Sequence, residues 1–277
     1  MNEVGIAFLY TIIAGLATGL GGIIAIAKKS VSGRMLAISL AFAAGVMIFV
    51  SFTEILFDAY HDIYYLYLTR GSSNPENVAF FIISLSFFLG VILMAIFDKL
   101  IPEDEINIED NKITTNEIYN EIEKKKLKRV GIMSAIAVTI HNMPEGIMVF
   151  LAAMINPTLG IGVCFAIAIH NIPEGIAIAA PIYNATGNRL KALKYAFLSG
   201  LSEPVGGMVA FIVLINLTDV QQIFPVIFAA VSGIMVYVSL ASLLPTAYKF
   251  EKGTQVTKAL FFGMAFMALS LVFLGLF

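Results

Sequence analysis

Two stretches of the sequence carry the same motif: TIHNMPEGIMVF at residues 139–150 and AIHNIPEGIAIA at residues 168–179. His, Asn, Pro, Glu and Gly recur at the same spacing, so that His141 is matched by His170, 29 positions later. Both stretches are otherwise apolar. Each therefore places two ionisable residues and a proline in surroundings where charge is costly and helices are easily disturbed.

The composition indicates that these surroundings are lipid. The chain has 277 residues, of which 59% are hydrophobic and only 13% are charged, and its mean hydropathy is +0.89. Soluble globular proteins carry about 25% charged residues. An apolar stretch of about 20 residues spans a bilayer, and the sequence predicts eight such helices, at about 4–27, 35–57, 78–98, 130–154, 159–183, 191–216, 223–248 and 257–277. We therefore expect an all-α integral membrane protein with a single transmembrane domain over residues 1–277.

Other bulk features exclude little. The first apolar span begins at Val4 without a basic segment before it, which favours a retained helix over a signal peptide. The single cysteine, Cys164, lies within an apolar span and rules out an intrachain disulfide. The net charge of −2 does not identify a partner.

Basic residues predict the orientation, because Lys and Arg accumulate in cytoplasmic loops. Apart from Arg70, every basic residue falls in alternate loops between the predicted helices: Lys28, Lys29, Arg34, Lys99, Lys112, Lys124, Lys125, Lys126, Lys128, Arg129, Arg189, Lys191, Lys194, Lys249, Lys252 and Lys258. This split predicts both termini outside the cytoplasm. The long polar segment, about 101–129, is then a cytoplasmic linker, mobile or partly helical. It contains no His or Cys that would favour metal sensing.

Internal repeats predict the architecture. GLATGLGGIIA (15–25) resembles GLSEPVGGMVA (200–210) at an offset of 185, and GVMIFVSFTEIL (45–56) resembles GIMVYVSLASLL (233–244) at an offset of 188. Five helices separate each pair, so the copies cross in opposite directions. The sequence predicts a 3+2+3 arrangement, with helices 1–3 inverted relative to helices 6–8 around a central pair. Inverted repeats of this kind are typical of transporters that bind substrate near the membrane midplane.

The repeated motif can supply metal ligands inside the membrane. His141 and Glu145 are four residues apart and share one helical face, and Asn142 lies beside them. The second copy repeats the arrangement, and the next helix adds a carboxylate immediately before a proline. Imidazole and carboxylate groups suit Zn²⁺ and neighbouring divalent ions, and amide oxygens can supplement them. The predicted metal ligands are His141, Asn142, Glu145, His170, Asn171, Glu174 and Glu203.

The prolines of the motif have a predicted part of their own. Pro144 and Pro173 cannot donate to the carbonyl groups of Ile140 and Ile169, so we expect a local kink and a freed carbonyl oxygen beside each His. A purely structural hydrogen-bond network and a proton-only relay are the competing interpretations. Neither accounts as well for two mirrored copies of a His, Asn and Glu set.

HNMPEG and HNIPEG on adjacent helices, followed by GLSEPVGG, resemble the ZIP (Zrt/Irt-like) family of divalent-metal transporters, in particular its prokaryotic ZupT/GufA-like branch. The resemblance covers essentially the whole chain. It implies eight helices arranged 3+2+3 and uptake of Zn²⁺, often with Fe²⁺, Mn²⁺, Co²⁺ or Cd²⁺, through a binuclear centre between helices 4, 5 and 6. One ion would be held by His141, Glu145, His170 and Glu174, and the other by Asn142, Asn171 and Glu203, with Glu145 and Glu174 able to bridge.

The sequence departs from the family pattern in two places. Ser242 stands where many relatives have an acidic residue before LLP, and the 101–129 loop lacks the histidines often found in that loop. Weaker candidates for the pathway or its entrance lie on helix 2, where ordinary packing or a solvated helix end explains them about as well: Met47, Glu54, Asp58, His61 and Asp62.

Other functions stay open. A divalent-cation channel would show the same ligands. An intramembrane zinc hydrolase would want an HExxH motif, which the sequence lacks, so we do not expect an enzyme. The expected location is the cell (inner) membrane, with the lipid bilayer and divalent metal ions as partners. No nucleic-acid partner is expected, and homodimerisation is left open.

Overall fold

The computed structural model describes residues 3–27, 32–100, 115–216, 223–251 and 253–274. Within these ranges the chain is helical apart from short connections and contains no strand. Eight helical stretches of this described part are long and apolar enough to cross a membrane. A helix suits this environment because it satisfies its backbone hydrogen bonds within itself. The predicted set of eight apolar helices is confirmed at this level.

The elements follow one another along the chain as a series of helices, two of which continue through a π-helical turn. The first half contains α1 (Glu3–Ile26), α2 (Gly33–Val50), the π-helical turn η1 (Ser51–Ile55), α3 (Leu56–Thr69), α4 (Pro75–Leu100) and α5 (Thr115–Ile155). The second half contains α6 (Pro157–Thr186), α7 (Arg189–Gly200), α8 (Ser202–Asn216), α9 (Ile223–Val238), the π-helical turn η2 (Ser239–Leu243), α10 (Leu244–Phe250) and α11 (Thr254–Leu274).

The helices extend beyond the apolar stretches that predicted them. The second crossing continues through η1 and α3 to Thr69 rather than ending near residue 57. The fourth crossing begins at Thr115 and so includes part of the polar 101–129 segment, whose residues 101–114 lie outside the described part. Hydropathy marks where the hydrocarbon ends, whereas a helix can continue into water on its own hydrogen bonds.

Local sequence signals set the ends of α6. The Asn156 side chain accepts a hydrogen bond from the Thr158 backbone N–H at 2.8 Å, and Pro157 occupies the first turn, where a missing N–H costs nothing. Gly187 ends the helix at φ 66°, a left-handed conformation that glycine adopts without strain. Between these ends α6 runs through Pro173, and α5 likewise runs through Pro144, without a change of helix type.

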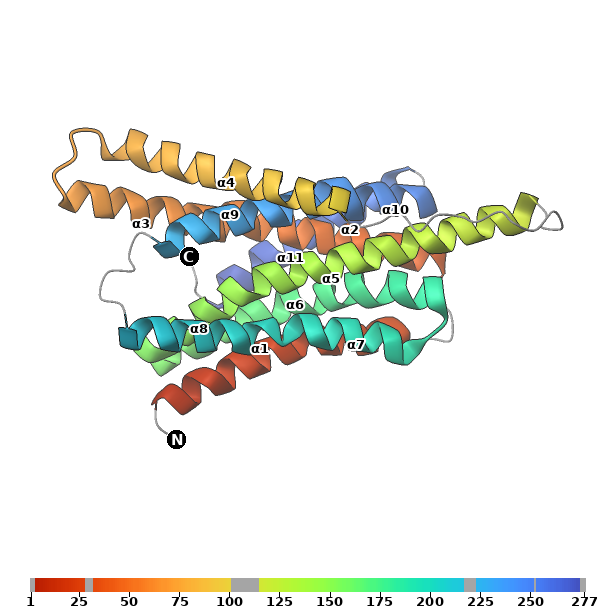
Figure 1. Cartoon of the computed structure of the whole chain (residues 1–277), viewed down its shortest axis with the longest axis horizontal. Coiled ribbons are helices and arrows are strands. Elements are labelled where there is room, and N and C mark those ends of the chain that lie inside the picture. The colour runs from red at the N-terminus through yellow and green to blue at the C-terminus, as the bar shows by residue number, and fades with distance from the viewer. Residues whose placement is uncertain (1–2, 28–31, 101–114, 217–222, 252, 275–277) are drawn as a thin grey trace.

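The helices pack in two groups (Figure 1). In the first, which we call the motif bundle, α1 and α5 pack along α6, and α7 and α8 pack against α1 and α5. In the second, the flanking bundle, α2 packs along α11, α4 packs along α9, and α3 and α10 complete the group. The two bundles meet where α5 lies against α9 and α6 lies against α2, and we call this contact the seam.

The outer surface suits lipid. Only 22% of the apolar stretch of α4, and 22% of that of α11, is buried inside the protein. Phe80 and Phe81 on α4 and Phe261 and Phe262 on α11 are each more than 60% exposed. In water such a surface would be unfavourable, whereas in hydrocarbon it costs little. Burial therefore separates a lipid-facing shell from an interior that includes several polar residues.

Glycines allow the closest helix contacts, and these contacts come in matching pairs. A Cβ on Gly15 of α1 would collide with the carbonyl of Gly200 on α7, and a Cβ on Gly200 would collide with the carbonyl of Gly15. These glycines are separated by 185 positions, the offset of the first sequence repeat. The π-helical turns η1 and η2 are separated by 188 positions, the offset of the second. Two hydroxyls repeat as well, since Ser51 donates to the Met47 carbonyl and Ser239 donates to the Met235 carbonyl.

Candidate metal centre

The motif residues lie near the middle of the apolar spans Lys124–Met154 of α5 and Gly160–Thr186 of α6, inside the motif bundle. His141, Asn142, Asn171 and Glu174 have no solvent-exposed surface, and Glu145 is 1% exposed. The structure thus buries every described ionisable group of the two motifs. The side chain of His170 lies outside the described residues. Since burial of an unpaired charge costs several kcal/mol or more, the contacts among these groups decide what they can do.

His141 and Glu174 form the first contact of the centre. Their atoms Nε2 and Oε2 are 3.2 Å apart, and both side chains are fully buried. This contact joins α5 to α6 across the two copies of the motif, as the antiparallel packing of the repeats predicted. Imidazole nitrogen next to carboxylate oxygen is a donor set that suits Zn²⁺. We refer to these two residues as the His141–Glu174 pair.

Glu203 gathers the second set of contacts. Its Oε1 accepts hydrogen bonds from the side-chain amides of Asn142, at 3.3 Å, and of Asn171. The same amide nitrogens also reach α1: Asn142 contacts Thr18 Oγ1 at 3.4 Å, and Asn171 donates to the Ala14 carbonyl at 3.0 Å. We call Glu203, Asn142, Asn171 and Thr18 the Glu203 cluster. Its donor set is entirely oxygen and amide.

Thr18 is a member of the cluster that the sequence interpretation missed. It is fully buried on α1, within a run of small residues. A signal was present, because the repeat that aligns 15–25 with 200–210 places Thr18 opposite Glu203 at the offset of 185. A polar residue aligned with an intramembrane carboxylate was therefore a candidate partner.

A break in the sixth membrane-crossing helix places Glu203 at the beginning of a new helix. The prediction was one helix over 191–216, but the helix is interrupted at Leu201, and Glu203 lies in the first turn of α8. Pro204 explains the interruption, because it has no N–H to donate to the carbonyl of Gly200. The N-terminal end of a helix favours negative charge. The break therefore places the carboxylate where the backbone stabilises it.

Several oxygen atoms of the centre are buried and have no hydrogen-bond partner among the described residues. They are Oδ1 of Asn142 and of Asn171, Oε1 of Glu174 and Oε2 of Glu203. Buried polar atoms in native proteins are nearly always satisfied, and an acceptor oxygen can be satisfied by a hydrogen-bond donor, by a water molecule or by a cation. Within the described part of the chain, no three His, Cys, Asp or Glu side chains are gathered tightly enough to hold an ion by themselves. A bound ion would therefore need the amide oxygens, His170 or a local rearrangement.

The weaker candidates on helix 2 separate into different surroundings. Met47 is 1% exposed and belongs to the main apolar core, as ordinary packing predicts. Glu54 lies in η1, at the position that corresponds to Ser242 in η2. Asp58 is largely exposed on α3, and His61 packs on Phe57 of its own helix, with Nδ1 at 3.0 Å from the Phe57 carbonyl oxygen.

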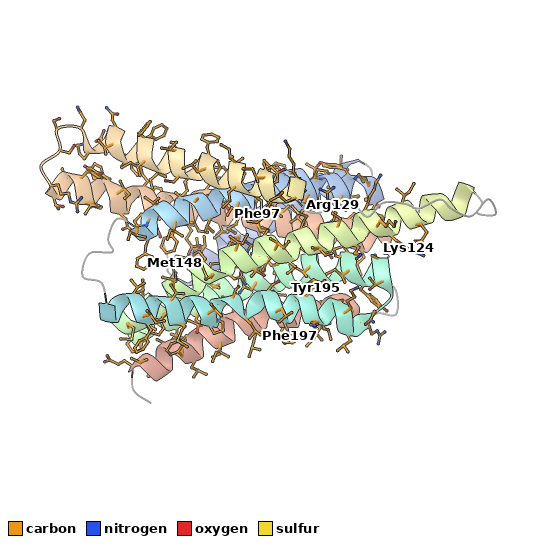
Figure 2. The ribbon with its side chains drawn as sticks, in the orientation of Figure 1. Phe97, Lys124, Arg129, Met148, Tyr195 and Phe197 are labelled. Atoms are coloured by element: carbon orange, nitrogen blue, oxygen red, sulfur yellow. The ribbon has the colours of Figure 1, made fainter. Side chains whose placement is uncertain are left out.

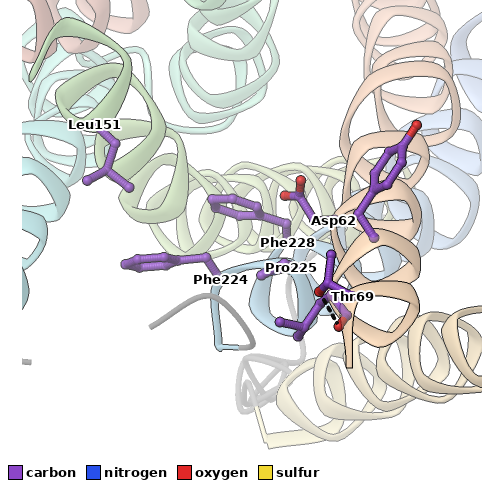
Figure 3. Close-up of a pocket in the computed structure, with 8 residues that line it drawn as sticks. Asp62, Thr69, Leu151, Phe224, Pro225 and Phe228 are labelled. Carbon is purple, nitrogen blue, oxygen red and sulfur yellow. Dashed lines mark hydrogen bonds between the residues drawn. The ribbon is translucent and has the colours of Figure 1, made fainter. Parts of the chain in front are cut away.

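Asp62 lines a cavity of about 450 Å³ on the seam (Figure 3). The cavity lies between α3, the end of α5 and the beginning of α9, and its wall is otherwise largely apolar. The lining residues are Asp62, Tyr65, Leu66, Thr69, Leu151, Phe224, Pro225 and Phe228. The structure thus brings one of the predicted entrance residues, Asp62, to a cavity, whereas Asp58 and His61 are not among its lining residues.

Known proteins resemble this chain over nearly its whole length. The sequence profile of the family described as ZIP Zinc transporter matches residues 100–271. A protein of Chlorobium chlorochromatii described as zinc transporter ZupT is 45% identical over 266 residues, covering 96% of each chain. Proteins with the same description are 45% identical in Corynebacterium efficiens, over 96% of each chain, and 42% identical in Nitratidesulfovibrio vulgaris, over 98% of each chain.

Proposed function

The chain belongs to the ZIP zinc transporter family and is a multi-pass membrane transporter rather than an enzyme, and from this premise we propose that it carries Zn²⁺ into the cytoplasm. The observation that carries the proposal is the fully buried polar centre between α5, α6 and α8. There a His–Glu pair and a Glu–Asn cluster leave acceptor oxygens without hydrogen-bond partners among the described residues. The names of the similar proteins support zinc as the transported ion.

We propose further that the centre is binuclear. The first ion would use His141, Glu145, His170 and Glu174, and the second would use Asn142, Asn171 and Glu203. The division follows the contacts, since His141 contacts Glu174 while both amides contact Glu203. Both amides turn their N–H groups to Glu203. Half a turn of each amide exchanges nitrogen for oxygen, which would satisfy a cation in the same place.

The matched helix contacts support an inverted repeat as the transport device. Gly15 with Gly200, and η1 with η2, recur at the two offsets of the sequence repeat. The 3+2+3 arrangement would relate α1–α4 to α7–α11 around the central pair α5 and α6. Such a repeat permits two equivalent conformations, open to opposite sides of the membrane. The protein would lie in the cell (inner) membrane. Both of its termini would then be outside the cytoplasm.

Metal would reach the centre from the cavity at Asp62. The cavity lies on the seam, and its carboxylate can attract cations near the mouth. Glu54 and Asp58 precede Asp62 along the same helical stretch, so they would extend the acidic path. Met47 and His61 stay weaker candidates, because the first is packed in the core and the second contacts its own helix.

Flux of Zn²⁺ into proteoliposomes tests the proposal. Glu145, which belongs to the same motif as His141 and is 1% exposed, is the residue to change. Glu145→Ala should abolish most of the flux while the protein still inserts and purifies as a folded species. Glu251→Gln, a change at a carboxylate of the flanking bundle beyond α10, is the matched control and should transport normally. Normal flux in Glu145→Ala would contradict the assignment of the metal site.

The same assay addresses selectivity and mechanism. Competition by Fe²⁺, Mn²⁺, Co²⁺ and Cd²⁺ would rank the ions that a mixed nitrogen and oxygen donor set accepts. Saturation of the flux at micromolar Zn²⁺ with slow turnover is expected of a carrier, in which the two sides never open together. A rate that rises without saturation would favour the alternative, a divalent-cation channel.

A further inference from the structure

The seam has different structures at its two ends. At one end it holds the cavity lined by Asp62 and Leu151 (Figure 3). At the other end it is crossed by a polar contact between Asp98 on α4, Arg129 on α5 and Tyr237 on α9. Along α5, Leu151 and Arg129 are 22 positions apart, which corresponds to about 33 Å. Along α9, Phe224 of the cavity and Tyr237 of the contact are 13 positions apart, which corresponds to about 20 Å.

The polar contact is centred on Asp98, in the last turn of α4. Arg129 Nη2 donates to the Asp98 backbone carbonyl at 2.7 Å and to its Oδ1 at 3.2 Å. The Tyr237 hydroxyl donates to the other carboxylate oxygen, Oδ2, at 3.0 Å. Asp98 and Tyr237 belong to the flanking bundle, whereas Arg129 belongs to the motif bundle. The contact therefore ties the two bundles together, at the level where α4 ends (Figure 2).

The layer behind this contact is apolar and closed. One helical turn further in from Asp98 lies Met94, and one turn further in from Arg129 lies Met133. Both methionines are no more than 1% exposed and belong to the same buried core as Met235 of α9. The seam is thus open to a cavity at the Asp62 end and sealed at the Arg129 end, where basic residues accumulate.

We propose that Asp98, Arg129 and Tyr237 form a latch that holds the seam closed at the Arg129 end, and that these residues separate when the seam opens to that side. In the inverted-repeat scheme, opening to one side goes with closure of the other. The latch would then set the balance between the two conformations. Its role in metal release rests on the proposed function, whereas the closure itself can be tested without any metal.

Accessibility of a buried thiol measures the closure. The parent protein carries Cys164→Ser, which removes the native thiol, and Met133→Cys, which places a reporter directly behind the latch. A membrane-impermeant maleimide is added to inside-out vesicles, without zinc, so that it approaches from the Arg129 end. Tyr237→Phe and Asp98→Asn should raise the labelling rate by about threefold to tenfold, the weight of one or two hydrogen bonds.

A second ion pair at the same end provides the matched control. Arg34 and Glu251 approach to 3.9 Å within the flanking bundle and do not cross the seam. Glu251→Gln should leave the labelling rate unchanged. The double variant with Asp98→Arg and Arg129→Asp restores an ion pair with the charges exchanged. Its labelling rate should therefore be lower than that of Asp98→Asn and closer to that of the parent.

Three outcomes would overturn the latch. They are equal labelling in the parent and Tyr237→Phe, an equal increase in Glu251→Gln, or faster labelling from the opposite face only. Tyr237→Phe removes a single hydroxyl and keeps the ring, so it remains decisive even if Asp98→Asn fails to fold. Loss of zinc flux in Glu145→Ala without any change in labelling would separate the proposed function from the latch.

Discussion

The two halves of the polar centre bury their charges differently. The His141–Glu174 pair places a titratable nitrogen against a carboxylate, whereas in the Glu203 cluster one carboxylate oxygen is held by two amides that also contact α1. The pair joins α5 to α6, and the cluster also joins α1 and α8 to these helices. Under the proposed function, the pair would hold one ion through nitrogen and oxygen atoms, and the cluster would hold the second ion through oxygen atoms alone.

Glu174→Ala should have the largest effect. It removes the partner of His141 and an expected metal ligand together, so we expect Zn²⁺ flux to fall by at least ~10- to 100-fold, the loss that even outer partners of metal ligands produce. Proteoliposome flux at a fixed amount of folded protein measures it. A flux near that of the unchanged protein would show that the pair is structural.

Glu203→Gln should have a smaller effect and a different character. Gln keeps an acceptor for the amides of Asn142 and Asn171 but loses the charge, so transport should slow or change selectivity by about tenfold. Purified protein should still retain one tightly bound zinc ion, counted by elemental analysis. Loss of all bound metal would refute two separable sites, since the pair should then suffice for one ion.

Binding of metal should release protons, mainly from the pair. His141 must be neutral, and Glu145 and Glu174 ionised, to bind metal. We expect a net release of protons when metal binds, measured between pH ~5.5 and ~7.5, and weaker zinc binding as the pH falls.

Calorimetry in buffers of different ionisation enthalpy measures this release, and Glu203→Gln should preserve it if the pair is its source. Zero release over that interval would mean that the empty centre is already deprotonated. A cycle in which metal and protons exchange would then have to be abandoned.

Thr18→Val should have the smallest effect. It removes only the 3.4 Å contact with the Asn142 amide, so the KM for zinc should change by about two- to threefold. The control is Thr11→Val on the same helix, because Thr11 donates to the Phe8 carbonyl of its own helix and should leave the KM unchanged. Equal effects of the two changes would remove Thr18 from the cluster.

The sequence predicts those features that depend on the free energy of transferring side chains from water into hydrocarbon. Charge is so costly in hydrocarbon that apolar runs identify the crossings and buried polar residues identify the centre. The convergence of the two motifs was predictable, because two copies of one motif on packed antiparallel helices can face each other, whereas the grouping of Glu203 with Asn142 and Asn171 came from the resemblance to the family.

Features that depend on tertiary contact were not predictable in the same way. The π-helical turns do not follow from hydropathy, which carries no information about helix register, whereas the interruption at Leu201 had a local signal in Pro204. The Ser232 hydroxyl donates to the Ser51 carbonyl at 3.0 Å from another helix, a contact that no local pattern reveals. The continuation of the second crossing to Thr69 was missed because polar and aromatic residues there end the apolar run but not the helix.

The π-helical turn η1 determines which way the side chains of α3, the helix that follows it, face. A π turn accommodates one more residue than an α turn, and one residue corresponds to about 100° of rotation. Deleting a single residue within Ser51–Ile55 would restore a plain α-helix and swing Asp62 by that angle, away from its cavity. The turn η2 carries the same extra residue at the matching position. The helical stretch through η1 and the one through η2 are therefore rotated by the same angle relative to plain α-helices. A deletion in one of the two turns would therefore rotate the residues that follow it, while the corresponding residues of the other repeat would keep their orientation.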